Sequence, residues 1–166
     1  ESESSEKCFD KIASHEAIER LGLKMPEYKQ VTISYIDDVL FTKPYVLKPI
    51  SDGSSKDTQI VRKVTPESLK ISKELLETCN TMLLEELIEG VEVTVGVLGS
   101  ESLPVVAIIP PEGEEFTLEN KYNGRTREIC PVDDSLVSRS SQGAAREVAL
   151  KIHNELGCRH FSRTDM

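Results

Sequence analysis

The sequence is short of positive charge and of long apolar runs, and both shortages exclude broad classes of protein. Lysine and arginine number 20 against 29 aspartates and glutamates, which leaves a formal net charge of −9. A surface of this sign repels nucleic acids and anionic membranes. No apolar run approaches the ~18 residues of a membrane span, and residues 1–6 lack the basic and apolar regions of a signal peptide. We therefore expect a cytoplasmic protein that binds neither nucleic acid nor membranes.

Cysteine and histidine are also scarce, and neither is spaced as in a metal site. No Cys-x-x-Cys pair occurs, and the apolar neighbours of the cysteines favour reduced, largely buried thiols over a disulfide framework or a zinc site. The cysteines are Cys8, Cys79, Cys130 and Cys158. The histidines, for which we expect no catalytic role, are His15, His153 and His160.

Apolar spacing predicts helices and strands in mixed order. The expected helices cover residues 10–21, 66–78 and 135–156. The expected strands cover residues 45–49, 58–64, 82–88, 91–98, 103–109 and 158–166. Two pairs of these strands, within 45–64 and 82–109, have the short connections of antiparallel neighbours. The pattern therefore predicts an α+β fold and not a parallel doubly wound sheet.

Polar groups stand where they could bind a nucleotide triphosphate, which needs lysines and N–H groups for phosphate and a carboxylate for ribose. Lys48 precedes a polar turn at residues 51–55, which is either a plain surface turn or an anion-binding one. It is not a P-loop, because Gly-x-x-x-x-Gly-Lys-Ser/Thr is missing. Glu85, Glu86 and Glu92 interrupt apolar strands. They form a solvated strand face, or at least one of them points at a ligand.

Three further charged residues and one charged loop stand out. Lys11 falls in the first turn of a predicted helix, where a cation opposes the helix dipole, so it is either solvated or held by an anionic ligand. Arg163 and Asp165 lie two residues apart and so share one face of the final strand. The charged loop at residues 112–127 is long enough to be a functional flap.

Taken in order, these segments resemble the D-alanine–D-alanine ligases, which belong to the ATP-grasp superfamily of carboxylate–amine ligases. The likeness runs from Phe9 to Asp165. It rests on Tyr45-Val-Leu-Lys-Pro, Gly53-Ser-Ser, Leu83-Leu-Glu-Glu-Leu-Ile, Glu92-Val-Thr, Asn120-Lys-Tyr and Arg163-Thr-Asp. The resemblance implies an ATP-grasp fold, with a disordered acidic start at 1–9, a central region with a glycine-rich lid at 10–92, and part of the catalytic region at 93–166.

The resemblance also implies roles for individual residues, with ATP and Mg²⁺ (or Mn²⁺) as cofactors. The implied phosphate-binding residues are Lys11, Lys48, Lys121 and the lid residue Ser55. The implied adenine and ribose contacts are Glu85, Glu86, Leu87, Ile88 and Glu92. The implied catalytic residues are Arg163, which stabilises an oxyanion, and Ser54 and Tyr122, which close the site over substrate. Asp165 is the implied metal ligand.

The implied reaction joins two D-alanine molecules for peptidoglycan synthesis in a homodimeric parent enzyme. One D-alanine carboxylate attacks the γ-phosphate of ATP, and the amine of the second displaces phosphate from the acyl phosphate. The protein contributes positioning and charge neutralisation.

Several positions depart from the family pattern. Asp57 replaces a second lid glycine, Leu87 replaces a common aromatic, and Thr117 and Leu118 precede the Lys-Tyr pair in place of acidic and aromatic residues. The chain stops before the family's Glu-x-Asn metal motif and lacks its amino-terminal domain, so we expect a fragment. Two alternatives stay open: a catalytically incomplete ATP-binding module, and an ATP-grasp ligase for another amino or hydroxy acid.

Overall fold

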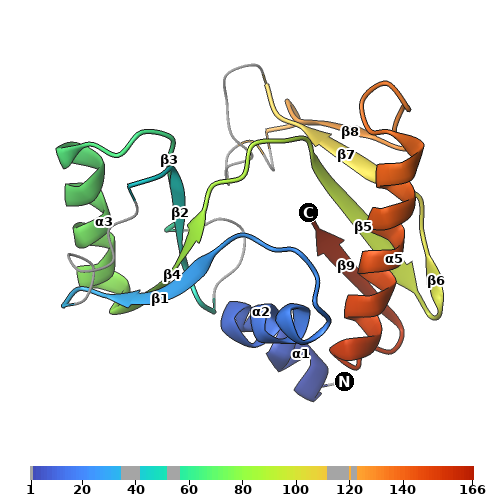
Figure 1. Cartoon of the computed structure of the whole chain (residues 1–166), viewed down its shortest axis with the longest axis horizontal. Coiled ribbons are helices and arrows are strands. Elements are labelled where there is room, and N and C mark those ends of the chain that lie inside the picture. The colour runs from blue at the N-terminus through green and yellow to red at the C-terminus, as the bar shows by residue number, and fades with distance from the viewer. Residues whose placement is uncertain (1, 35–41, 52–56, 112–119, 121–122) are drawn as a thin grey trace.

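The computed structural model describes residues 2–34, 42–51, 57–111, 120 and 123–166. Within them, two antiparallel sheets stand side by side, each with a helix on its outer side, and a pair of short helices lies between them (Figure 1). The helices are α1 (Ser2–Phe9), α2 (Lys11–Arg20), α3 (Pro66–Cys79) and α5 (Arg139–Glu155). The predicted α+β class is confirmed.

The first sheet has the strand order β1-β4-β2-β3. Its strands are β1 (Tyr28–Thr32), β2 (Tyr45–Pro49), β3 (Gln59–Val61) and β4 (Thr81–Glu86). The core between this sheet and α3 is apolar and includes Leu47, Leu76 and Met82, none of them exposed. α3 begins at a capping box in which Thr65 and Ser68 bond each other's backbone N–H groups. These apolar faces explain why the predicted strand 45–49 and helix 66–78 both form.

The second sheet has the order β6-β5-β7-β8, and β9 pairs with the other edge of β5. Its strands are β5 (Glu92–Leu98), β6 (Glu101–Ser102), β7 (Val106–Ile109), β8 (Arg127–Ile129) and β9 (Phe161–Asp165). α5 covers this sheet, and its core includes Val95, Ala107 and Ala149, all fully buried. The sequence pattern predicted neither β8 nor β1, since both are short and have few apolar residues.

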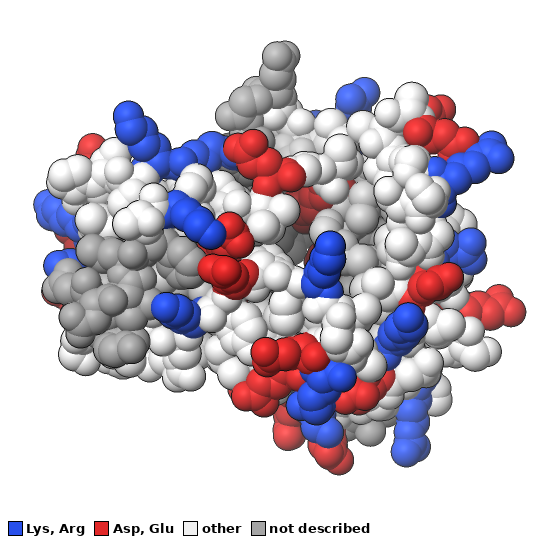
Figure 2. All heavy atoms as spheres, viewed as in Figure 1, with Lys and Arg blue, Asp and Glu red and all other residues white. Residues whose placement is uncertain are grey.

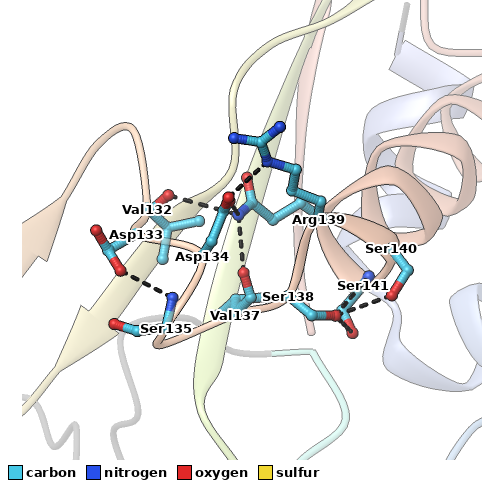
Figure 3. A network of polar contacts seen from close by, with 10 residues as sticks. Val132, Asp133, Asp134, Ser135, Val137, Ser138, Arg139, Ser140 and Ser141 are labelled. Carbon is cyan, nitrogen blue, oxygen red and sulfur yellow. Dashed lines mark hydrogen bonds and ion pairs between the residues drawn. The ribbon is translucent and has the colours of Figure 1, made fainter.

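α5 begins later than the predicted start at residue 135. The N–H groups of Leu136 and Val137 both donate to the Asp133 carbonyl at 3.0 Å, which makes this segment a turn. Ser138 then caps the helix by accepting a hydrogen bond from the Ser141 N–H, at 3.2 Å (Figure 3). The Gln142 side chain ties the helix back to this turn through the Val137 carbonyl, at 2.8 Å. A hydrogen-bonded turn and a cap therefore fix the start of α5.

A third apolar cluster joins α2 to α5 and so links the two sheets. Its buried members are Ala17 of α2 and Ile152 and Leu156 at the end of α5. Ile152 also lines the space between the two sheets. This packing sets the separation at which residues of the two sheets face one another.

The start of the chain corrects one prediction, because residues 2–9 form α1 where we expected disorder. Ser4 donates a hydrogen bond to the Gly157 carbonyl at 2.7 Å, and Lys7 pairs with Glu3 at 2.8 Å. The acidic, serine-rich composition favours disorder in isolation. Contacts with the distant end of α5 supply the stabilisation that the composition lacks.

The cysteines correct a second prediction. All four are free thiols, as expected, but Cys8 and Cys130 are exposed and not buried. The Cys8 sulfur lies 3.6 Å from that of Cys158, and burial raises the pKa of the Cys8 thiol to about 11. In the part of the chain described here, no helix is both long and apolar enough to cross a membrane.

Candidate functional site

A cavity of about 480 Å³, here called the main cavity, lies between the two sheets, with α2 and α5 contributing to its walls. Figure 2 shows the surface hollowed between the two halves, with acidic side chains inside the hollow. Lys48 of β2, Glu85 of β4, Glu92 of β5 and Asp165 of β9 all line it. The fold thus brings together charged residues far apart in the sequence, with Lys48 and Asp165 separated by 117 positions.

Glu85 is the most buried charge in this cavity, with its side chain only 8% exposed. One carboxylate oxygen lies 2.5 Å from His15 Nε2, and the other makes a close ion pair with Lys48 Nζ. Burial by itself raises the pKa of Glu85, but the hydrogen bond from His15 and the charge of Lys48 outweigh it and hold that pKa below its ordinary value. Glu85 is therefore an ionised carboxylate with both oxygens engaged.

Strand register explains why Lys48 meets Glu85. Val46 of β2 stands opposite Glu85 of β4, so Lys48 is the diagonal neighbour on the same face of the sheet. Side chains alternate along a strand, so Glu86 points to the other face, where its carboxylate lies 3.4 Å from Lys43 Nζ. Of the two adjacent glutamates predicted for the site, only Glu85 lines the cavity.

The segment after β4 carries the next two predicted residues. Ile88 lines the main cavity together with Glu92. Leu87 does not, and instead lines a neighbouring cavity of about 620 Å³, which also borders Ile88 and Glu92. The Leu87 N–H donates to the Pro44 carbonyl at 3.1 Å, which fixes the backbone at this point.

Lys11 is tied to the backbone at the end of β2, and its predicted contact with an anionic ligand stays a prediction. Its ammonium donates hydrogen bonds to the backbone carbonyls of Pro49, at 2.8 Å, and Ile50, at 3.4 Å. The N–H of Lys11 also donates to the Ile50 carbonyl, at 3.0 Å. These carbonyls offset the unfavourable helix dipole and tie the start of α2 to the end of β2.

Asp165 and Arg163 share one face of β9, as predicted. Arg163 donates to both oxygens of Asp165, at 2.9 and 3.1 Å, and Thr94 Oγ1 donates to one of them at 2.7 Å. Asp165 lines the main cavity, whereas Arg163 lines a separate one of about 410 Å³ that also contacts Ser4 and Ser5. Among the described residues, no group of three or more His, Cys, Asp or Glu could hold a metal ion.

His15 is the residue that sequence reasoning missed at this site. Its ring packs edge-on against that of Tyr28, with centroids 4.6 Å apart, and its Nδ1 lies 2.6 Å from the Lys11 carbonyl. The sequence carries no spacing signal for it, because its partner Glu85 is 70 positions away (85 minus 15). That His15 has no catalytic role stays a prediction.

Four predicted site residues lie outside the described residues, namely Ser54, Ser55, Lys121 and Tyr122. The same is true of Thr117 and Leu118, two of the positions that depart from the family pattern. Asp57 is described, and its φ of 53° places it in the left-handed region that favours glycine. A glycine-like backbone conformation is thus kept at a position where an aspartate stands.

Comparison with known proteins places this chain in a family. The model of the family described as the D-ala D-ala ligase C-terminus matches residues 18–166. The chain belongs to this family. The D-alanine–D-alanine ligases of Rhizorhabdus wittichii and Aquifex aeolicus are each 35% identical to it, over 164 and 162 residues. These alignments cover 95% of the chain but only 51% and 53% of the relatives, so the chain spans about half their length.

Solved structures of family members have the same fold. VanG D-Ala:D-Ser ligase from Enterococcus faecalis superposes on the whole chain with a TM-score of 0.80 and 25% identity, over 50% of its own length. The D-alanine–D-alanine ligase from Bacillus anthracis complexed with ATP matches 99% of the chain and 52% of its own, with a TM-score of 0.70 and 24% identity. The predicted ATP-grasp fold is confirmed.

Proposed function

We propose that this chain is the nucleotide-binding region and part of the catalytic region of an ATP-dependent D-alanine–D-alanine ligase. One observation carries the proposal. Lys48, Glu85, Ile88, Glu92 and Asp165 come from both sheets, and all five line a single cavity. The family resemblance of the sequence implies a nucleotide or metal contact for each of them. The family relationship supplies the reaction class, the joining of a carboxylate to an amine.

The cavity fits an adenine nucleotide in size and in chemistry. Its volume of about 480 Å³ lies within the range of small-molecule sites. Apolar side chains, Ile18, Met25 and Ile152 among them, supply surface for a base. In the proposal, Glu85 and Ile88 contact the adenine and Glu92 the ribose. The backbone around Glu86 and Leu87 completes the adenine contacts.

The triphosphate would be held by cations near the end of β2. Lys48 is the candidate whose contacts are best defined, since its side chain lines the cavity and is 26% exposed. The Lys11 ammonium is bonded to the carbonyls of Pro49 and Ile50, at the end of the same strand. Ser55 and Lys121 would complete the phosphate site. Lysines suit this role because they neutralise phosphate charge as compact cations.

Asp165 is the proposed ligand for Mg²⁺ (or Mn²⁺). Mg²⁺ binds through one or two carboxylates together with phosphate oxygens and water, so a single protein carboxylate fits it. When bound, the ion would neutralise charge on the transferring phosphoryl group. Arg163 is placed beside Asp165 by their shared salt bridge, at 2.9 Å, and would donate to the oxyanion. Ser54 and Tyr122 would close the site over substrate.

The finer assignments belong to the same proposal. The parent would be a cytoplasmic homodimer that uses D-alanine, with its central region at 10–92 and its catalytic region at 93–166. A second substrate other than D-alanine is a specific alternative, because the D-Ala:D-Ser ligase VanG superposes with the TM-score of 0.80. A catalytically incomplete ATP-binding module is the other, because the chain spans half of its relatives.

The test is ATP binding in the presence of Mg²⁺, measured by calorimetry on this chain and on Lys48→Ala. We expect wild type to bind and Lys48→Ala to bind about tenfold more weakly, because one charge-assisted contact to phosphate is lost. Lys70→Ala is the matched control, since Lys70 is a lysine on α3 whose side chain is 77% exposed. Absence of ATP binding in a folded wild-type sample would overturn the proposal.

Phosphate release measured in the same samples separates the alternatives. Release that depends on D-alanine would identify a complete ligase site. Release that requires D-serine as the second substrate would favour the D-Ala:D-Ser alternative. Binding without release would identify the ATP-binding module.

A further inference from the structure

We propose that His15, in its protonated form, is a positioning residue that holds the Glu85 carboxylate in place when Lys48 turns to the phosphates of a bound nucleotide. This inference rests on the proposed function, since it assigns Glu85 to the base and Lys48 to phosphate. It adds a residue that neither the motifs nor the family relationship assigned. It also predicts a pH dependence for binding.

The first step is the hydrogen bonding of the His15 ring. Nδ1 lies 2.6 Å from the Lys11 carbonyl oxygen, which can only accept, so Nδ1 must carry a proton. Nε2 lies 2.5 Å from a Glu85 oxygen. In a neutral imidazole Nε2 would have no proton, and its lone pair would face the carboxylate. Both contacts are favourable together only when a second proton lies between Nε2 and Glu85.

The location of that proton follows from the second partner of Glu85. Lys48 makes a close ion pair with the other carboxylate oxygen, which favours the ionised form of Glu85. An ionised Glu85 leaves the proton on His15 and makes it an imidazolium. Glu85 therefore has two cationic partners, one on each oxygen.

Other charged groups surround the His15 ring. The cavity that His15 lines contains three carboxylates, from β4, β5 and β9, against two lysines. They are Glu85, Glu92, Asp165, Lys24 and Lys48. Tyr28 of β1 meets the ring edge-on, and Lys11, Glu16 and Glu19 lie on the same helix. Glu85 is the one carboxylate among them that contacts the ring directly.

The two partners of Glu85 differ in their freedom to move. The His15 side chain is 13% exposed, and it sits on a helix whose start is capped by Asp10 and bonded to the end of β2. The Lys48 side chain is twice as exposed, at 26%, and has a long flexible stem. Lys48 can therefore exchange its carboxylate partner for phosphate, whereas His15 stays. Without His15, the buried Glu85 would lose its last cation when the nucleotide binds.

The pH dependence has a definite sign. Where the pH is low enough to keep His15 protonated but high enough to keep Glu85 ionised, Glu85 is held, so nucleotide binding is tightest there. As pH rises and His15 loses its proton, it keeps the bond to the Lys11 carbonyl and releases Glu85. Affinity for the nucleotide then falls.

The experiment measures ATP affinity between about pH 6 and 8, within the range in which histidine changes its charge, for wild type and His15→Gln, alongside the NMR titration of the His15 ring. Glutamine is neutral and can donate to only one of the two acceptors with the same geometry. We expect His15→Gln to bind about tenfold more weakly than wild type where His15 is protonated, and equally where it is neutral. The ratio of the two affinities removes the effect of ATP's own ionisation. His160→Gln is the control, because His160 lies outside this cavity.

Two further measurements keep the inference falsifiable. His15→Lys keeps a cation that does not titrate in this range, so it should bind ATP with little of the wild-type pH dependence. In the ligand-free wild type, ¹⁵N shifts should report protons on both ring nitrogens at the low end of the range. A constant ratio between wild type and His15→Gln at every pH would indicate a merely structural role and overturn the inference.

Failure of the proposed function gives a different result. If folded wild type binds no ATP, the proposed function fails. The NMR titration of the ligand-free chain still tests the pairing of His15 with Glu85. If ATP binds but Nε2 carries no proton at the low end of the range, only the inference fails.

Discussion

Two carboxylates line the same cavity, and they are held in opposite ways. Glu85 is 8% exposed and lies on β4, an inner strand of its sheet, with a histidine on one oxygen and a lysine on the other. Asp165 is 52% exposed and lies on an edge strand, with one arginine and one threonine as donors. Solvent can replace the donors of Asp165 but not those of Glu85. The difference teaches that the buried carboxylate depends on its protein partners for its stability, whereas the exposed one does not.

The strongest way to break this comparison is to remove Glu85. Glu85→Ala leaves His15 and Lys48 without their carboxylate in a largely buried place, and we expect the free energy of unfolding to fall by about 3 kcal/mol. Urea denaturation of both proteins measures it. Asp165→Ala is the matched control and should lose less than about 1 kcal/mol, since its ion pair is exposed. Equal losses in the two variants would contradict the comparison.

The fold was predictable wherever a local signal marks an element. Pro66 after Thr65 indicates the start of α3, and Gly157 indicates the end of α5. The α1 helix was not predictable, because Ser4 is held by Gly157, which lies 153 positions away. Short strands such as β8 are held by pairing with a neighbour and have too little pattern of their own.

The candidate site was predictable as a set of residue types but not as a geometry. Lys48, Glu85, Glu92 and Asp165 were found from the motifs, and all four line one cavity. Strand register decides that Glu85 faces it while Glu86 does not, and the unbroken apolar run before Glu85 has no alternation from which its face could be read. Likewise, the hydrogen bonds that tie the start of α2 to the end of β2 bring His15 to Glu85. Contacts of this kind arise from the fold and not from spacing.

A change of pH sharpens the comparison, because the pKa of Glu85 is held below its ordinary value of 4.5. A depressed pKa means that Glu85 contributes stability above the pKa of the unfolded chain and loses it as pH falls through the folded value. Wild type should therefore lose stability below about pH 4.5 more steeply than Glu85→Gln. Denaturation midpoints at several acidic pH values measure this. Parallel curves for the two proteins would show that the pairing has no influence on acid stability.

The smallest expected effect on stability comes from Arg163, and it completes the comparison from the exposed side. Arg163 is 69% exposed and its bidentate pair with Asp165 faces solvent, so Arg163→Ala should change the free energy of unfolding by less than about 1 kcal/mol. The proposed oxyanion role predicts a far larger effect on turnover in the parent enzyme, about a hundredfold, with ATP binding nearly unchanged. Urea denaturation, calorimetry and phosphate release on the same variant measure the three quantities. A loss of ATP binding as large as the loss of turnover would count against the oxyanion role. Arg163 should therefore matter little for stability and much for turnover, as expected of a residue whose ion pair is exposed and replaceable at an active site.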